Sequence, residues 1–183
     1  MALIEEEILL KNLKDETTRA KAFEVLLNKY KERLYWHIRR IVLNHDDADD
    51  VLQNTFIKVF RSIDGFEGKS KLYSWLYRIA TNEALSFLTS KSRKLGISDH
   101  DLQNRMVMNL KADSYFEGDE IQYKLQEAIA TLPEKQKLVF NMKYFDDLKY
   151  QEISAILDTS VGGLKASYHL AVKKIESFIK DSL

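Results

Sequence analysis

Apolar residues recur at spacings of three and four through most of this chain, which is the period of helices that bury one face. One proline and six glycines are few interruptions for 183 residues. We therefore expect an all-α protein. The pattern predicts helices at about residues 5–13, 18–43, 47–63, 71–90, 134–144, 150–157 and 161–180.

Some helix boundaries carry local signals. Asp46 is the expected N-cap of the third helix, because carboxylates in a first turn suit the helix dipole. Pro133 stands where a first helical turn tolerates proline. Residues 96–119 have clustered polar side chains and no sustained period, so we predict a linker with at most a short helical turn near residues 102–110.

The last two predicted helices have the proportions of a helix-turn-helix, with a short helix, a tight turn and a longer helix. An apolar stripe on the longer helix is formed by Leu164, Tyr168, Ala171, Ile175 and Phe178. Residues early in such a helix enter the major groove and reach base edges. The candidate DNA-reading residues are Lys165, Ala166, Ser167, His169, Leu170 and Lys173. A terminal amphipathic helix with a solvated face is the alternative.

Residues 66–94 place four aromatic side chains and one asparagine between a glycine-containing loop and a basic end. Unstacked bases are held by stacking on flat side chains and by hydrogen bonds to their edges, while Lys and Arg neutralise the phosphates. The candidate residues for this role are Phe66, Gly68, Lys69, Ser70, Tyr73, Trp75, Arg78, Asn82, Ser86 and Arg93. An ordinary buried helix is the alternative, since aromatic stripes are common in protein cores.

The predicted helix at residues 47–63 presents a polar face that DNA binding does not explain. Its core stripe consists of Ala48, Leu52, Thr55, Phe56 and Val59. The outward residues are Asp50, Gln53, Asn54, Ile57 and Lys58, and the first four are the candidate polymerase-binding residues. Carboxylate, amide and apolar groups together suit a protein partner better than a polyanion, although a simply solvated face is the alternative. A metal site at His45 and its neighbouring aspartates is a weaker explanation, because those side chains do not converge on one point.

The composition limits the function classes. Cysteine is absent, which excludes disulfides and thiolate sites. No apolar run approaches the roughly 20 residues that span a bilayer, and the first residues are acidic, so we expect a cytoplasmic protein without direct membrane insertion. The four histidines lie in separate segments, and no H-E-x-x-H or Gly-rich phosphate loop occurs. We expect no enzyme activity, no cofactor and no metal.

Charge is distributed unevenly, although the formal net charge is zero. Residues 1–95 carry 17 basic and 14 acidic side chains, residues 96–121 carry 2 and 6, and residues 122–183 carry 9 and 8. An acidic connector thus separates two mildly basic halves. A free-standing DNA-binding protein usually has a clear basic excess. We therefore expect weak DNA binding by the isolated chain and a role inside a larger complex.

Three runs together resemble the extracytoplasmic-function (ECF) sigma factors of bacteria. The run WLYRIATNEA, after the loop FEGKS and before a basic tail, is similar to their promoter-melting segment. The run LPEKQKLVFNMKYFDDLKYQEISAILDTSVGGLKASYHLAVKKIESF is similar to their C-terminal promoter-binding domain, and DADDVLQNTFIKVF to the motif that docks on the polymerase clamp. Departures include Lys137 for arginine, Gly163-Leu164 for threonine-valine, and Asn54 for glutamate.

The resemblance implies a sigma region 2-like domain at residues 1–95, a flexible acidic linker at 96–121, and a region 4-like helix-turn-helix domain at 122–183. It also implies promoter-specific initiation by reading −10 and −35 elements. The implied partners are promoter DNA, the clamp coiled coil and flap of core RNA polymerase, and an anti-sigma factor, free or membrane-tethered. The alternatives are a stand-alone helix-turn-helix regulator of duplex DNA and a helical adaptor. A duplex binder needs neither the aromatic loop nor the clamp-like face, and an adaptor leaves Asn82 and the basic tail unexplained.

Overall fold

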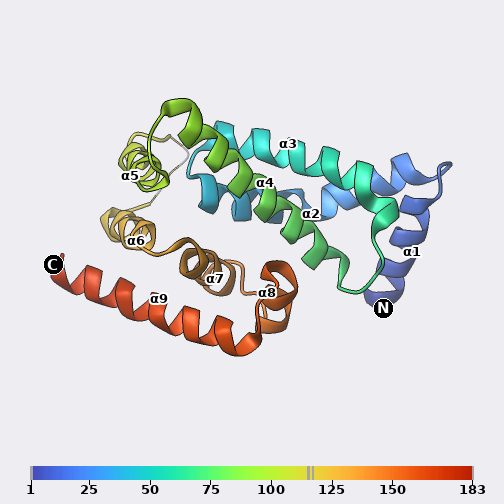
Figure 1. Cartoon of the computed structure of the whole chain (residues 1–183). Helices are drawn as coiled ribbons and strands as arrows, with labels where there is room; N and C mark the ends of the chain where they lie inside the picture. Colours follow the sequence, from blue (N-terminus) through green and yellow to red (C-terminus); the bar gives the residue numbers. More distant parts are fainter. Residues whose placement is uncertain (1, 115, 117, 183) are drawn as a thin grey trace.

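The computed structural model describes residues 2–114, 116 and 118–182, and every regular element among them is helical (Figure 1). None of the described helices is both long and apolar enough to cross a membrane. The elements are α1 (Ala2–Lys14), α2 (Arg19–Val42), α3 (His45–Ser62), the short 3-10 helix η1 (Ile63–Gly65), α4 (Leu72–Leu95), α5 (Asp99–Leu110), α6 (Glu120–Ala130), α7 (Glu134–Tyr144), α8 (Tyr150–Leu157) and α9 (Val161–Asp181).

The seven predicted helices are confirmed as α1 to α4 and α7 to α9. The start of α3 differs in detail from the prediction. The N-cap is Asn44, whose side chain accepts a hydrogen bond from the backbone N–H of Asp47 at 2.9 Å, whereas Asp46 already lies inside the first turn. Asn44 has the extended backbone of an N-cap residue, which places its side-chain oxygen on a free N–H group of the first turn.

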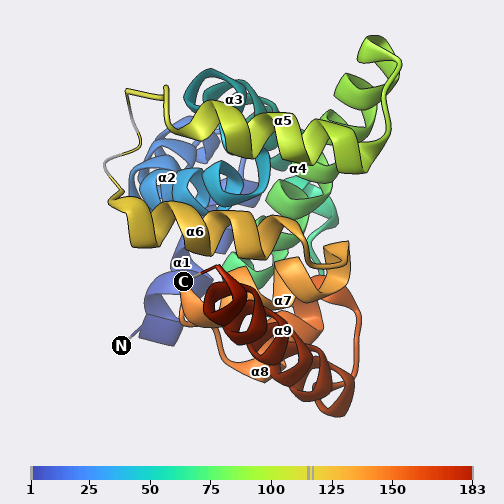
Figure 2. The same ribbon diagram turned by 90° about the vertical axis from the view of Figure 1, so that its left-hand side faces the viewer.

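The predicted linker contains more regular structure than its sequence indicated. Helix α5 is a full helix of 12 residues, with Leu102, Met106, Val107 and Leu110 buried along one side. These residues pack with Tyr123 of α6, and α5 and α6 lie side by side (Figure 2). The interpretation that this segment has no sustained helical period was therefore wrong. Residues 115 and 117 of the predicted linker lie outside the described residues.

Helices α2, α3 and α4 pack together as the body of the first half, with α1 across one end (Figure 1). Their amphipathic stripes form one core, and its fully buried members include Leu26, Leu34, Ile38, Leu76 and Tyr77. In the second half, α6, α7 and α9 share a smaller core around Phe140, Ala171 and Ile175. Helix α8 follows α7 and precedes α9, which confirms the predicted helix-turn-helix.

The two halves are packed against each other. The core of the first half continues into α7, α8 and the start of α9 through Met142, Leu148, Ile153, Ile156 and Leu164. Helix α8 lies against α4, and α7 lies against α2. The described chain is therefore in a closed arrangement, in which the helix-turn-helix covers part of the first half.

A buried polar cluster ties the halves together at Asp146, in the turn between α7 and α8. One carboxylate oxygen accepts a hydrogen bond from Arg40 at 2.6 Å, and the other lies 3.0 Å from Nδ1 of His37. Nε2 of His37 is 2.8 Å from the hydroxyl of Thr81, and Arg33 donates to the Asp146 carbonyl oxygen at 3.3 Å. Because Asp146 is nearly inaccessible to solvent, these contacts are well shielded from water.

Candidate nucleic acid and polymerase interfaces

The loop between η1 and α4 is held in place by residues of α1 and α2. Lys14 donates to the carbonyl oxygen of Phe66 at 2.7 Å, and Arg19 forms an ion pair with Asp64 at 2.7 Å. At the other end of the loop, the carboxylate of Glu6 accepts the N–H of Leu72 at 2.8 Å, so α1 caps the amino terminus of α4. The loop is thus positioned by partners 45 to 66 residues away in sequence.

Phe66 was predicted to be a free stacking ring, but in this arrangement its side chain is only 5% exposed. It packs against Trp75, with ring centroids 5.2 Å apart, and Trp75 itself is half-buried. The Phe66 ring has no polar group that must reach water, so it can be buried against Trp75 under the loop, while Trp75 keeps part of its surface accessible. Phe66 therefore supports the loop from inside, while Gly68 and Lys69 remain exposed and Ser70 is half-exposed.

The outer face of α4 presents the polar residues expected there. Asn82 and Ser86 are exposed one turn apart, and Arg78 and Arg93 are exposed towards the two ends of the helix. Trp75 lies two turns before Asn82 on the same side. An amide, a hydroxyl and two guanidinium groups are thus available along a single helix.

Helix α8 covers the beginning of α4. Glu152 forms an ion pair with Lys71 at 3.2 Å, and Tyr73 donates a hydrogen bond to the same carboxylate. Burial, followed by the Glu152 carboxylate, raises the pKa of the Tyr73 hydroxyl well above its ordinary value. Desolvation pushes the pKa of Glu152 upward, but hydrogen bonds from Tyr73, the Lys149 N–H and Lys71 outweigh it and hold that pKa below its usual value. Glu152 is therefore a charged acceptor at neutral pH.

A cleft of about 900 Å³ separates the loop from the helices that face it. Its walls combine the loop with acidic residues of α1 and polar residues of α8. They include Glu6, Glu7, Gly68, Lys69, Ser70, Lys71, Lys149, Gln151 and Glu152. Lys69 pairs with its neighbour Glu67. In the closed arrangement the predicted single-strand-binding loop thus faces carboxylates, which repel a phosphate backbone.

The predicted partner face of α3 is open. Asp50, Gln53 and Asn54 are exposed, and Ile57 is 49% exposed. The structure adds Phe60, one turn after Ile57, which is 42% exposed although its ring contacts Phe23. Sequence reasoning missed Phe60, but its spacing of three from Ile57 was the available signal. The face therefore joins a polar part to an apolar part.

The predicted reading face of α9 is also open. Its exposed members are Lys165, Ala166, His169, Leu170 and Lys173, and Ser167 is half-buried. The opposite stripe packs inward, with Leu164, Ala171 and Ile175 buried. Ser160 caps the helix by accepting the N–H of Gly163 at 3.2 Å, which fixes the start of α9 directly after the turn.

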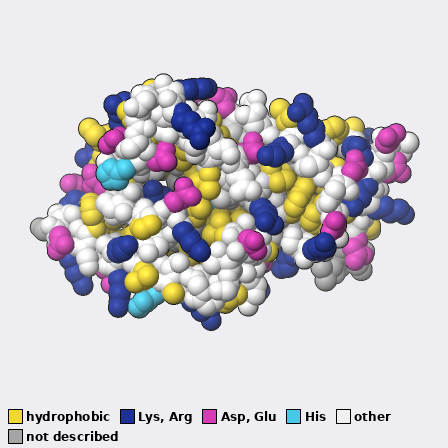
Figure 3. Space-filling view, viewed as in Figure 1, with side chains coloured by type: hydrophobic (Ala, Val, Ile, Leu, Met, Phe, Trp, Pro, Cys, Tyr) yellow, Lys and Arg dark blue, Asp and Glu magenta, His cyan; other side chains and the backbone are white. Residues whose placement is uncertain are grey.

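Lysine and arginine side chains are interspersed with aspartate and glutamate over the face of the molecule in Figure 3. That face has no broad region of positive charge. Local contacts, rather than a long-range positive field, must therefore direct any DNA binding there.

Comparison with known proteins identifies the family of this chain. Residues 26–94 match the family model for Sigma-70 region 2, and residues 122–175 match the model for Sigma-70, region 4. An "ECF RNA polymerase sigma-E factor" of Haemophilus influenzae is 33% identical, over 87% of this chain and 88% of the relative. This chain belongs to the ECF sigma factors of the sigma-70 family. Sigma-E factors of Salmonella typhimurium and Escherichia coli K12 are each 30% identical, over 87% of both chains.

Two solved structures share the fold of this ECF sigma factor. CnrH, in complex with the cytosolic domain of CnrY, has a TM-score of 0.71 and 18% identity, and the match covers 97% of this chain and 99% of CnrH. RpoE of Bartonella quintana, in complex with the anti-sigma factor NepR, has a TM-score of 0.66 and 21% identity, with 87% and 98% covered. The region 2 match contains the α3 and α4 faces, and the region 4 match contains the reading face of α9. Helices α1 and α5 lie outside both matches.

Proposed function

We propose that this ECF sigma factor recruits core RNA polymerase to promoters through three separate faces. Residues 1–95 form the polymerase-binding and −10 unit, residues 96–121 the connector, and residues 122–183 the −35 unit. The protein acts by binding alone, without catalysis or a cofactor. The observation that supports the proposal is the exposure, in one chain of this family, of three chemically different faces on α3, α4 and α9.

The −10 unit works on separated strands. Opening a duplex costs stacking energy, and a protein recovers part of it by holding a flipped base in a pocket. Asn82 supplies an amide for a base edge, and Lys69 and Arg78 supply charge for the phosphates. Phe66 and Trp75 contribute by supporting the loop, and a ring becomes available to a base only if the loop rearranges.

The −35 unit reads duplex DNA. Lys165 and His169 lie about one turn apart at the start of α9 and reach phosphates or base edges, while Leu170 offers an apolar contact for a thymine methyl. This face carries fewer cations than a free-standing helix-turn-helix protein needs. We infer that polymerase supplies the remaining affinity.

The closed arrangement must open for both units to act together. Elements named −10 and −35 lie roughly 25 base pairs apart, which is about 85 Å of duplex at 3.4 Å per base pair. A compact chain of 183 residues has a radius of gyration of about 16 Å and is roughly 40 Å across. The closed molecule is too small to reach both elements. We infer that core polymerase binds the open form.

An anti-sigma factor is the expected regulator. The solved structures with this fold contain the cytosolic domain of CnrY and the anti-sigma factor NepR. We propose control of the same kind here, in the cytoplasm where polymerase acts, by a free or membrane-tethered partner.

Run-off transcription with purified core polymerase tests the proposal. The chain should confer promoter-dependent initiation on core, and the double change Asp50→Lys with Gln53→Ala should weaken competition for core while circular dichroism stays unchanged. Glu24→Lys, an exposed charge reversal on α2, is the control and should compete as wild type does. A stand-alone regulator would instead bind duplex DNA without core, and that result would contradict the proposed recruitment of core polymerase.

A further inference from the structure

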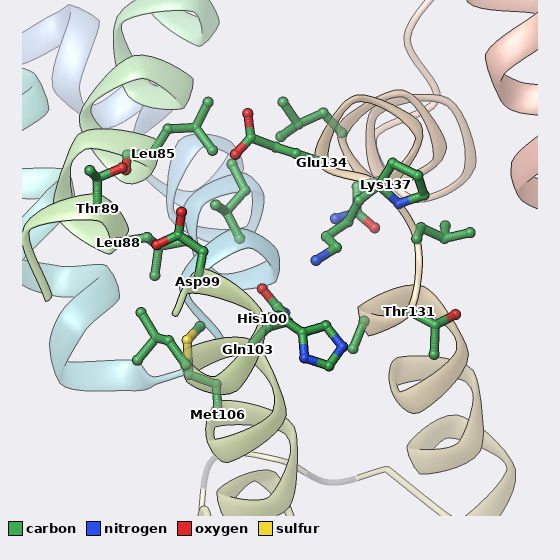
Figure 4. Close-up of a pocket in the computed structure, with 17 residues that line it drawn as sticks. Leu85, Leu88, Thr89, Asp99, His100, Gln103, Met106, Thr131, Glu134 and Lys137 are labelled. Carbon is green, nitrogen blue, oxygen red and sulfur yellow. The ribbon is translucent and has the colours of Figure 1, made fainter. Parts of the chain in front are cut away.

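A cavity of about 340 Å³ lies at the junction of the two halves, away from the three faces described above (Figure 4). Its walls come from α4, α5, α7 and the segment joining α6 to α7, with Ile41 of α2. The apolar part of the lining is formed by Leu85, Leu88, Leu102, Met106, Leu132 and Leu138. This volume lies within the range of small-molecule sites, and an apolar wall with few polar groups is their usual composition.

One cation points into this cavity. Lys137 extends from α7 towards the middle of the space (Figure 4), and its ammonium group has no hydrogen-bond or ion-pair partner among the described residues. Burial lowers the pKa of this ammonium to about 8, and the charge of Glu134 on the same helix opposes the decrease. Lys137 is thus mainly protonated at neutral pH, and its charge is only partly solvated. A buried charge in that state gains from a counter-ion.

The other ionisable groups that line the cavity leave the role of counter-ion to Lys137 unfilled. Asp99 accepts a hydrogen bond from Ser92 at 2.6 Å, and His100 contacts Asn104 of its own helix. In Figure 4 the side chains of Asp99 and Glu134 are directed towards α4, and neither forms an ion pair with Lys137 among the described residues. Among the residues that the structure describes, no arginine and no second lysine lines the cavity, so it lacks the paired cations that hold phosphate groups.

We propose that this cavity binds a straight-chain aliphatic carboxylate, with the hydrocarbon tail against the leucine and methionine side chains and the carboxylate on the Lys137 ammonium. The apolar walls select for the tail, and the single unpaired cation selects for a head group with one negative charge. A neutral aliphatic molecule of the same length gains only the contacts with the apolar walls.

Occupation of the cavity would act on the closed arrangement, an effect that rests on the proposed function. Leu85 and Leu88 belong to the −10 unit, and Leu138 and Lys137 belong to the −35 unit. Separation of the units removes one wall, so a ligand binds the closed form and shifts the population towards it. The carboxylate should therefore weaken binding to core polymerase.

Calorimetric titration of the full chain with hexanoate, octanoate and decanoate tests the site. Affinity should rise about fourfold for each added methylene until the cavity is full. Lys137→Met should reduce octanoate affinity about tenfold or more and leave octanol binding unchanged. Lys135→Met, an exposed lysine on the same helix, should change neither. Gln103→Trp, which fills the cavity from its wall, should block both ligands while circular dichroism confirms the fold.

The outcomes separate the site from its effect. Absence of octanoate binding at millimolar concentration, or equal binding of octanoate and octanol in wild type and Lys137→Met, would overturn the site. If octanoate binds as expected but competition for core is unchanged, the coupling to opening is wrong. If the chain fails to bind core at all, the proposed function is wrong, and the titration still decides the site.

Discussion

At the residue scale, Asn82 is the side chain whose loss most directly tests strand separation. It is exposed on the outer face of α4 and supports no packing in the closed arrangement. Asn82→Ala should therefore leave folding and core binding intact but impair promoter opening, because a lost amide contact weakens recognition of one base by about 1–3 kcal/mol. Permanganate footprinting reports the melted bases. Asn104→Ala, an exposed asparagine on α5, is the control, and normal melting by Asn82→Ala would contradict its predicted role.

Lys137 gives a second residue-scale prediction, since its pKa is lowered to about 8 from an ordinary value of 10.5. Glu134 favours the charged form, so Glu134→Gln should lower the Lys137 pKa further. The folded chain releases this proton before the unfolded chain does. The contribution of Lys137 to the free energy of unfolding should therefore rise between about pH 8 and pH 10.5. NMR titration of the lysine side chains measures the Lys137 pKa in the wild type and in Glu134→Gln. An ordinary pKa for Lys137 would show that the ammonium is solvated.

At the element scale, α9 separates contacts that position DNA from contacts that read it. If Lys165 touches a phosphate, Lys165→Ala should weaken all sequences alike and lower the salt slope by about one unit. If His169 or Leu170 touches a base, its replacement with alanine should change which −35 sequence is preferred. The change in discrimination at one base pair should be about 1–3 kcal/mol. Selection of −35 variants in the presence of polymerase distinguishes these effects. Lys180→Ala, about 22 Å further along the helix, should change neither. Wild-type preference and activity in Lys165→Ala, His169→Ala and Leu170→Ala would exclude α9 as the reading element.

The same scale shows how far sequence patterns reach. Helices such as α3 and α9 were predictable because one apolar stripe repeats over several turns. Helix α5 was missed because its stripe of four residues is short and the exposed Met108 interrupts the polar side. The exposed faces of α3, α4 and α9 followed from the same periodicity. Phe66 was misjudged because an aromatic ring in a loop carries no periodic signal for burial.

At the scale of the whole molecule, the closed arrangement was not predictable. It depends on pairs distant in sequence, such as His37 with Asp146, which are 109 residues apart. No local period or cap encodes such a pair. The junction also brings Glu152 onto Lys71 and creates the Lys137 cavity. Sequence patterns therefore predicted the exposed faces of single helices. Only the structure shows that the second half of the chain partly covers the first half.

We expect the closed arrangement to depend most on Asp146. Asp146→Asn keeps the shape of the side chain but removes the charge that Arg40 and His37 share. A buried hydrogen bond to a charged group contributes about 1.5–3 kcal/mol, so the ratio of open to closed molecules should rise about 10- to 150-fold. Because only the open form binds core, the apparent Kd for polymerase should fall by up to the same factor.

The neighbouring change Asp147→Asn provides a matched control, since Asp147 is exposed and asparagine tolerates its positive φ of 50°. The chain has no cysteine, so dyes placed at Lys94→Cys and Lys180→Cys, one in each half, report the opening by energy transfer. Asp146→Asn should lower the transfer and tighten core binding together. Lower transfer without tighter binding would show that opening is not what limits polymerase recruitment. Unchanged transfer would show that the apolar junction around Met142, Leu148 and Ile153 holds the halves together without this carboxylate.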